Sequence, residues 1–122
     1  WEQYCSADHL AVRFPDGGTS LRALTGVDKS RLRDARVSVP NFSAIPAFIK
    51  GTDLIATEMN LMKLSTLSDL DMAPLPKPSD PLTIYMTWHQ RSTSDPAHIW
   101  LRKRIEVVAQ KVVSAATLIQ SI

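Results

Sequence analysis

Cysteine is almost absent from this sequence, and long hydrophobic runs are absent too. The 122 residues include a single cysteine, Cys5, which leaves no partner for an internal disulfide or a thiolate metal site. The longest apolar runs, such as residues 54–56, are too short for a membrane span or a signal peptide. We therefore expect a protein of the reducing cytoplasm with no membrane partner.

An excess of either charge is also missing. The chain has 14 basic and 12 acidic side chains, so its formal net charge is only +2. This balance does not predict a surface that coats nucleic acid. With 44% apolar residues, the chain can bury the core of one ordinary domain.

The usual signatures of catalysis are missing as well. There is no G-x-S-x-G elbow and no glycine-rich phosphate loop, and residues 17–18 are better interpreted as a turn. His89 and His98 lie on different predicted elements without a third nitrogen, thiolate or carboxylate nearby, whereas zinc needs three or four converging ligands. We expect no enzyme, no metal and no cofactor.

What the sequence does contain is an alternation of short strands and short helices. Residues 9–14 form a compact β-prone run that is closed by a turn at residues 15–18. Residues 35–39 alternate polar and apolar, which is typical of a half-buried strand. Residues 52–57 are apolar through their middle, as expected of an inner strand in a parallel sheet.

Helix signals separate these strands. The first helix has its cap at residues 19–20 and its stop at Gly26. The second begins after Asn41 in the cap position and stops at residues 50–51, and a third, weaker helix covers residues 61–70. The apolar positions are Leu21, Leu24 and Val27 in the first helix and Phe42, Ile45, Phe48 and Ile49 in the second. The alternation predicts an α/β fold with a mainly parallel sheet and right-handed crossovers.

Prolines divide the chain into two packing units. Residues 73–81 contain four prolines in nine residues and predict an extended linker. Residues 82–89 alternate as a fourth strand whose two faces are both at least partly buried. A last helix then begins with Ser94 or Asp95 as its cap and Pro96 in its first turn. Its apolar stripe to the C-terminus comprises Ile99, Leu101, Ile105, Val108, Val112 and Ala115 or Ala116.

Aromatic and basic residues in this second unit have simple structural interpretations. Trp88 and Trp100 are expected to pack the strand against the helix, with each indole N–H on a backbone acceptor. His98 is expected to make a local hydrogen bond in the first turn of the helix. The basic residues 102–104 are best interpreted as a solvated helix face, and the alternative is contact with an acidic neighbour.

Four short motifs occur in a fixed order along the chain: VP-x-F at residues 39–42, TDLIAT at 52–57, WH-x-R at 88–91 and DPAH-x-WLR at 95–102. Together they resemble the effector-binding domain of LysR-type transcriptional regulators, in the branch that includes regulators of nodulation and of aromatic-compound degradation. The sequence departs from that pattern at Glu58 and the following Met, where many relatives have an apolar residue and a proline.

The resemblance implies a fold and a set of partners. In that family the effector-binding region has two α/β subdomains and is built like a type 2 periplasmic binding protein. Residues 1–80 would form the second subdomain, a mainly parallel sheet flanked by helices. Residues 81–122 would be the returning strand and C-terminal helix of the first subdomain. The DNA-binding winged helix-turn-helix domain has no counterpart here, so the resemblance implies a fragment that contacts DNA only through the absent domain and forms homodimers or homotetramers through effector domains.

The strongest candidate for a ligand site is the turn formed by Pro40, Asn41, Phe42 and Ser43. A helix N-terminus offers unpaired N–H groups and partial positive charge to a carboxylate. Asn41 and Ser43 add side-chain donors, and Phe42 adds an apolar wall. The alternative is that Asn41 merely caps the helix and Phe42 belongs to the core. The resemblance, in which this position lines the cleft between subdomains, favours ligand contact.

Two further segments are expected at the same edge of the sheet, where ligands of parallel α/β folds bind. They contribute Arg13 and Phe14 after the first strand and Glu58 after the third. Arg13 could pair with an acidic ligand or simply be a charge at the strand edge. His9 could face the hinge or be a buried, satisfied imidazole.

Three functional hypotheses follow. The first is a regulatory domain that binds a small organic effector, aromatic or carboxylated, in a cleft between subdomains. The second is an extracytoplasmic solute-binding protein of the same architecture. The third is a small α/β enzyme, which would need a convergent acid–base pair that the sequence does not reveal.

Overall fold

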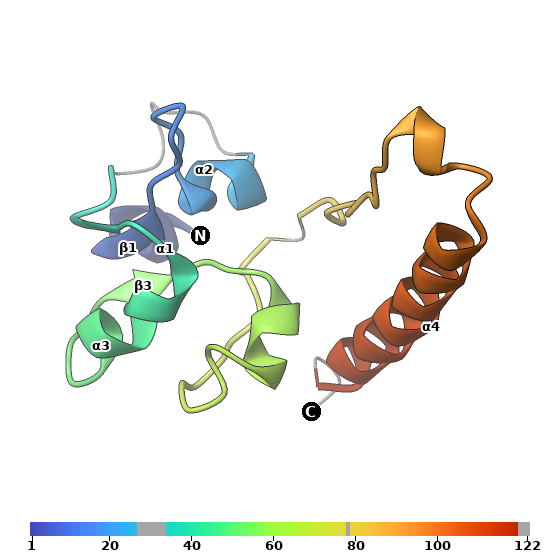
Figure 1. The fold of residues 1–122 in the computed structure, drawn as a ribbon. Coiled ribbons are helices and arrows are strands. Elements are labelled where there is room, and N and C mark those ends of the chain that lie inside the picture. The colour runs from blue at the N-terminus through green and yellow to red at the C-terminus, as the bar shows by residue number, and fades with distance from the viewer. Residues whose placement is uncertain (27–33, 78, 120–122) are drawn as a thin grey trace. The chain divides into compact units, whose positions relative to one another are not determined.

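The computed structural model describes residues 1–26, 34–77 and 79–119 (Figure 1). The chain separates into two compact units, Trp1–Asp80 and Pro81–Ile122. Val27, expected in the first helix, lies outside the described residues. The first unit contains the sheet and several short helices, and the second contains a short 3₁₀ helix and one long α-helix.

Three parallel strands form the sheet of the first unit. β1 (His9–Val12) lies between β2 (Val37–Val39) and β3 (Ile55–Ala56). Both pairings are parallel, which confirms the predicted α/β class. The prediction that residues 52–57 form an inner strand is wrong within the described part of the chain, because β3 is an edge strand. The inner position belongs to β1, the strand whose side chains are all buried.

The strands are shorter than predicted because the chain turns away soon after each one. Arg13 already forms an antiparallel bridge with Thr19, and the Phe14 N–H donates to the Gly18 carbonyl at 2.8 Å. The Asp16 carboxylate accepts from the Gly18 N–H at 2.9 Å. This closes the turn predicted at residues 15–18.

Successive side chains of β1 point to opposite faces, so the sheet has two packed faces. One face holds an apolar cluster with α3 (Ile45–Ile49). Its buried members are Leu10, Val12, Val39 and Ile45. The other face is covered by α1 (Glu2–Ser6), which the sequence did not predict, and by α2 (Ser20–Thr25). Its cluster comprises Ala11 and Leu21 with the partly buried Tyr4, Cys5 and Ala35. Figure 1 shows α2 and α3 on opposite sides of the strands.

The ends of the first two predicted helices are confirmed. α2 stops at Gly26, whose φ of 59° is left-handed and therefore favours glycine. Asn41 caps a short 3₁₀ helix, η1 (Phe42–Ala44), which continues into α3 and stops before Gly51. Phe48 is 52% exposed, so it does not join the core as its spacing predicted.

The helix predicted for residues 61–70 is wrong. The segment begins with a 3₁₀ helix, η2 (Asn60–Leu64), and continues in turns. The Lys63 ammonium donates to the carbonyls of Ser68 at 2.8 Å and Leu70 at 2.5 Å. The lysine thus satisfies two carbonyl groups of the turn conformation that replaces the predicted helix.

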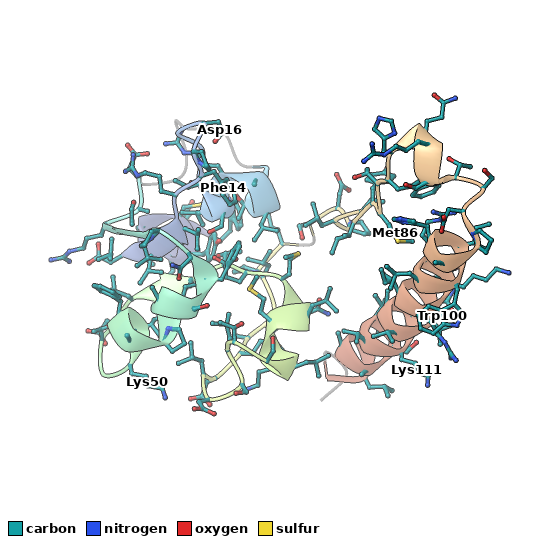
Figure 2. The ribbon with its side chains drawn as sticks, viewed as in Figure 1. Phe14, Asp16, Lys50, Met86, Trp100 and Lys111 are labelled. Atoms are coloured by element: carbon teal, nitrogen blue, oxygen red, sulfur yellow. The ribbon has the colours of Figure 1, made fainter. Side chains whose placement is uncertain are left out.

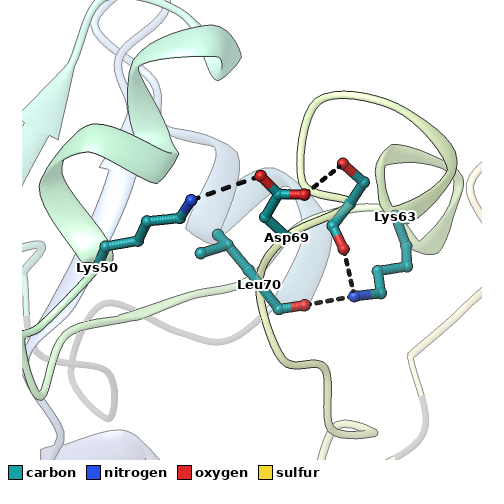
Figure 3. A network of polar contacts seen from close by, with 5 residues as sticks. Lys50, Lys63, Asp69 and Leu70 are labelled. Atoms are coloured by element: carbon teal, nitrogen blue, oxygen red, sulfur yellow. Dashed lines mark hydrogen bonds and ion pairs between the residues drawn. The ribbon is translucent and has the colours of Figure 1, made fainter.

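Asp69 ties the same segment to the end of α3. Its carboxylate lies 3.5 Å from the Lys50 ammonium and accepts from the Ser68 hydroxyl at 3.2 Å (Figure 3). The two lysines therefore hold the turns in place from two sides.

The strand predicted for residues 82–89 does not form. These residues are exposed and have no strand partner in the described part of the chain, so the expectation of two partly buried faces is also wrong. A strand needs a neighbour for its backbone hydrogen bonds, and the other elements of this unit are helical, η3 (Gln90–Ser92) and α4 (Pro96–Ile119). The Asp95 side chain caps α4 by accepting from the His98 N–H at 2.9 Å, as predicted. No helix in the described ranges is long and apolar enough to cross a membrane.

Arg102 organises the approach to α4. Its guanidinium lies 4.6 Å from the centroid of the Trp88 ring and donates to the carbonyls of Ser92 at 3.0 Å and Thr93 at 2.8 Å. The Trp88 indole donates to the Thr93 hydroxyl at 3.2 Å, not to a backbone acceptor as predicted. Trp100 is 61% exposed and extends from α4 (Figure 2), so its expected packing role is not seen in this unit.

Candidate functional site

The three segments that follow the strands lie at one edge of the sheet. Because β1, β2 and β3 are parallel, their carboxyl ends point the same way. We call this the carboxyl edge, formed by residues 13–14, 40–43 and 57–58. All seven residues predicted to bind ligand lie in it: Arg13, Phe14, Pro40, Asn41, Phe42, Ser43 and Glu58.

The turn at residues 40–43 shows the capping and core packing that the sequence left as the alternative to ligand contact. The Asn41 carbonyl oxygen Oδ1 accepts from the Ala44 N–H at 3.1 Å, so Asn41 is a cap. Phe42 is partly buried against the apolar core, while Asn41 and Ser43 are exposed. The first amides of a helical segment, those of Phe42 and Ser43, have no acceptor within the helix. Capping and core packing therefore leave Asn41 and Ser43 exposed.

Arg13 and Phe14 differ in exposure. The exposed Arg13 guanidinium donates to the Ser38 hydroxyl at 3.4 Å, and its backbone N–H donates to the Val39 carbonyl at 3.0 Å. Phe14 is partly buried beside the apolar core, at the start of the turn that carries Asp16 (Figure 2). The segment thus offers one cation and one aromatic ring to this edge.

Glu58 is turned into the protein. Its Oε1 accepts from the Ser20 hydroxyl at 2.7 Å, and the same hydroxyl accepts from the Val12 N–H at 3.0 Å. Its Oε2 is shielded from solvent and has no hydrogen-bond partner among the described residues. Burial raises the pKa of Glu58 to about 7, against the opposing effect of the Ser20 hydrogen bond. Through its bond to Ser20, Glu58 links the segment after β3 to α2 within the fold.

Tyr4, His9 and Thr57 form a polar cluster next to this bond, and the sequence did not reveal it. The Tyr4 hydroxyl lies 2.5 Å from the Thr57 hydroxyl, and burial raises the pKa of Tyr4. His9 is fully buried and its Nε2 lies 2.9 Å from the Tyr4 carbonyl oxygen, so Nε2 carries the hydrogen. Its Nδ1 has no partner among the described residues, so the imidazole is buried but only half satisfied. The position of Thr57 directly after a strand was the one available signal.

No metal centre accompanies these groups. Across residues 1–26, 34–77 and 79–119, no three histidine, cysteine or acidic side chains converge. The arrangement offers hydrogen bonds, one cation and aromatic surface to a ligand.

Several curated proteins are similar to this chain. Nodulation protein D 1 of Sinorhizobium fredii (strain NBRC 101917 / NGR234) is 33% identical over 105 residues, covering 84% of this chain and 33% of that protein. Nodulation protein D 2 of Rhizobium tropici is 31% identical over 119 residues, covering 93% and 37%. The HTH-type transcriptional activator NahR of Pseudomonas putida is 30% identical over 104 residues, covering 84% and 35%.

The chain belongs to the LysR-type transcriptional regulators. It spans about a third of the length of these curated relatives. No protein-family model matches the chain, and no solved structure matches it. Membership of the LysR-type regulators confirms the resemblance carried by the four motifs, and these relatives are regulators of transcription, not enzymes.

Proposed function

We propose that this chain is the effector-sensing part of a LysR-type regulator and that a small organic acid binds at the carboxyl edge. In this proposal residues 1–80 are the second subdomain of a type 2 periplasmic-binding-protein-like fold. Residues 81–122 complete the first subdomain. DNA would be bound by a part of the regulator that these residues do not include, and homodimers or homotetramers would form through effector domains.

The observation that carries the proposal is the parallel sheet with its polar turn at residues 40–43. A ligand carboxylate can accept from the unpaired amides of Phe42 and Ser43, from the Asn41 amide group and from the Ser43 hydroxyl. η1 and α3 are short, three and five residues, so the helix dipole adds little and direct hydrogen bonds must supply the affinity. Arg13 adds a positive charge at the same edge.

The aromatic rings of Phe14 and Phe42 favour a ligand with an apolar part beside its carboxylate. Phe14 and Phe42 are partly buried in the apolar cluster beneath the carboxyl edge. Their partial exposure offers apolar surface beside the hydrogen-bond donors, as ligand sites usually do. A flat aromatic acid satisfies both requirements.

Regulation follows if the ligand binds one arrangement of the two subdomains better than another. Only this difference in affinity can shift the equilibrium between the arrangements, and couplings of about 1–3 kcal/mol are common. The regulator relatives favour this hypothesis over an extracytoplasmic solute-binding protein.

Ligand-induced thermal shifts test the proposal. Benzoate and phenylacetate are expected to raise the Tm of the 122-residue chain, and uncharged benzamide is expected to raise it less. Asn41→Asp keeps an oxygen that can cap Ala44 but replaces the donor with a negative charge, so it should weaken benzoate binding by roughly tenfold or more. Ser43→Ala should also weaken binding.

The control is Ser65→Ala, which removes an exposed hydroxyl from the turn after η2, outside the carboxyl edge. It should bind benzoate like the unaltered chain. Equal shifts for benzoate and benzamide, or unchanged shifts in both carboxyl-edge variants, would remove the turn at residues 40–43 from the site.

A further inference from the structure

The two faces of the sheet differ in chemistry. The face against α3 is packed by aliphatic side chains, whereas the face under α1 and α2 carries a polar layer. This layer comprises Tyr4, His9, Ser20, Thr57 and Glu58. Buried polar atoms are costly unless they are hydrogen-bonded, yet Glu58 Oε2 and His9 Nδ1 have no partner among the described residues.

Ser20 is the centre of the layer and joins three elements. It is 1% exposed and is the first residue of α2. Its hydroxyl accepts from the Val12 N–H at the end of β1 and donates to Glu58 directly beyond β3. The hydroxyl has a single hydrogen, so this donation fixes its orientation. The start of α2 is therefore tied to the carboxyl ends of two neighbouring strands through one hydroxyl group.

The two protonation states of Glu58 are not equivalent in this geometry. When the carboxyl is ionised, its negative charge is shared with an Oε2 that is shielded from water and has no donor. When it is protonated on Oε2, the group is neutral and Oε1 still accepts from Ser20. Burial without a compensating charge penalises the ionised form.

We propose that Glu58 is a proton-operated latch: the protonated carboxyl is tolerated in the buried junction between α2 and the carboxyl edge, whereas the ionised carboxyl places an uncompensated charge there and destabilises the junction, although its bond to Ser20 persists. The proposal goes beyond effector binding, since it concerns the stability of the sensing fold itself. It does not require that any ligand bind at residues 40–43.

The direction of the effect follows from the pKa of Glu58. Burial raises this pKa from its ordinary value near 4.5 to about 7, and the Ser20 hydrogen bond opposes the change. A folded-state pKa above the unfolded value means that the folded protein binds the proton more tightly. The resulting stabilisation is complete below about pH 4.5 and is lost as the pH rises through about 7.

Other ionisable groups lie on the elements packed around the junction. Three lie on α1, namely Glu2, Tyr4 and Cys5. His9 lies in β1, Arg13 directly follows β1, and Arg22 lies on α2. Arg22 is ion-paired with Asp34. Burial raises the pKa of Glu58, and the Ser20 hydrogen bond lowers it.

Two measurements on the 122-residue chain test the latch. The ¹³Cδ chemical shift of Glu58, followed by NMR between pH 4 and 9, is expected to titrate with a midpoint near pH 7. Urea unfolding is expected to show the folding equilibrium constant decreasing by roughly tenfold between pH 5.5 and 7.5, a value that allows for partial solvent screening.

Glu58→Gln keeps an Oε1 acceptor for Ser20 and cannot ionise, so it should remove that part of the pH dependence. Glu106→Gln is the matched control and should leave the pH dependence unchanged. A Glu58 midpoint below pH 5, or the same pH dependence in Glu58→Gln as in the unaltered chain, overturns the proposal. If Glu58→Gln does not fold, the NMR midpoint of the unaltered chain decides the question by itself.

Discussion

Replacing Ser20 by alanine removes the hydroxyl that joins β1, α2 and the segment after β3. The Val12 N–H is then buried without an acceptor, which costs about 1–3 kcal/mol, and Glu58 loses its donor as well. Alanine is the better helix former by a few tenths of a kcal/mol, which is too small to offset these losses. We expect the free energy of unfolding to fall by about 2–3 kcal/mol.

That loss is large for a unit of this size. A domain of about 80 residues typically has a free energy of unfolding of about 4–12 kcal/mol, so Ser20→Ala would remove a substantial fraction of it. Urea unfolding followed by far-UV circular dichroism at pH 6 measures the change, and an unaltered m-value would show that the surface exposed on unfolding is the same. Ser65→Ala, with an exposed hydroxyl, should change the stability by less than about 0.5 kcal/mol.

A double-mutant cycle separates the Glu58 contribution from that of the Val12 amide. If the Ser20–Glu58 bond matters, Ser20→Ala should cost less in a Glu58→Met background, which lacks the acceptor oxygen, than in the unaltered chain, because the two side chains are directly bonded. A decrease in stability no larger than that of Ser65→Ala would refute the reasoning, since it would mean that the buried Val12 N–H finds another partner at no cost.

Three other substitutions test local features. Lys63→Met keeps the length of the side chain but loses both carbonyl contacts, and should lower the free energy of unfolding by about 1 kcal/mol, with faster amide exchange at residues 65–70. Asp95→Ala removes the cap of α4 and should cost about 1 kcal/mol of helix stability, seen as lost helical circular dichroism; Asp95→Asn should retain most of it. Arg102→Lys cannot contact both carbonyls with a planar fork, so the fluorescence spectrum of Trp88 should move toward that of a fully solvated indole. Amide exchange, circular dichroism or fluorescence that matches the unaltered chain would contradict the corresponding expectation.

The positions of the candidate site residues followed from local rules. Proline, glycine and asparagine terminate or begin elements through their own backbone and side-chain chemistry, so Gly26, Asn41 and Asp95 could be placed from the sequence. The parallel arrangement then brought residues 13–14, 40–43 and 57–58 to one edge. Ligand contact by these residues stays a prediction.

Failures occurred where the outcome depended on a partner distant in the sequence. Residues 82–89 have a clear alternating pattern, but a strand forms only when a neighbour supplies hydrogen bonds. Residues 61–70 had helical spacing, yet they form turns in which Lys63 binds the carbonyls of Ser68 and Leu70. Neither the missing strand partner nor the Lys63 contacts can be seen in a local sequence pattern.

The sequence by itself determined the α/β class and where several helices begin or end, because these depend on local backbone preferences. It also determined the membership of the LysR-type regulators, because its motifs can be compared directly with those of relatives. Only the tertiary structure decided which strand is central, that Glu58 points inward to Ser20, and that Tyr4 and Thr57 meet across 53 positions of the chain. Burial and hydrogen-bond pairing are set by the three-dimensional packing of distant segments. A sequence alone therefore does not show whether water or protein surrounds a carboxyl group.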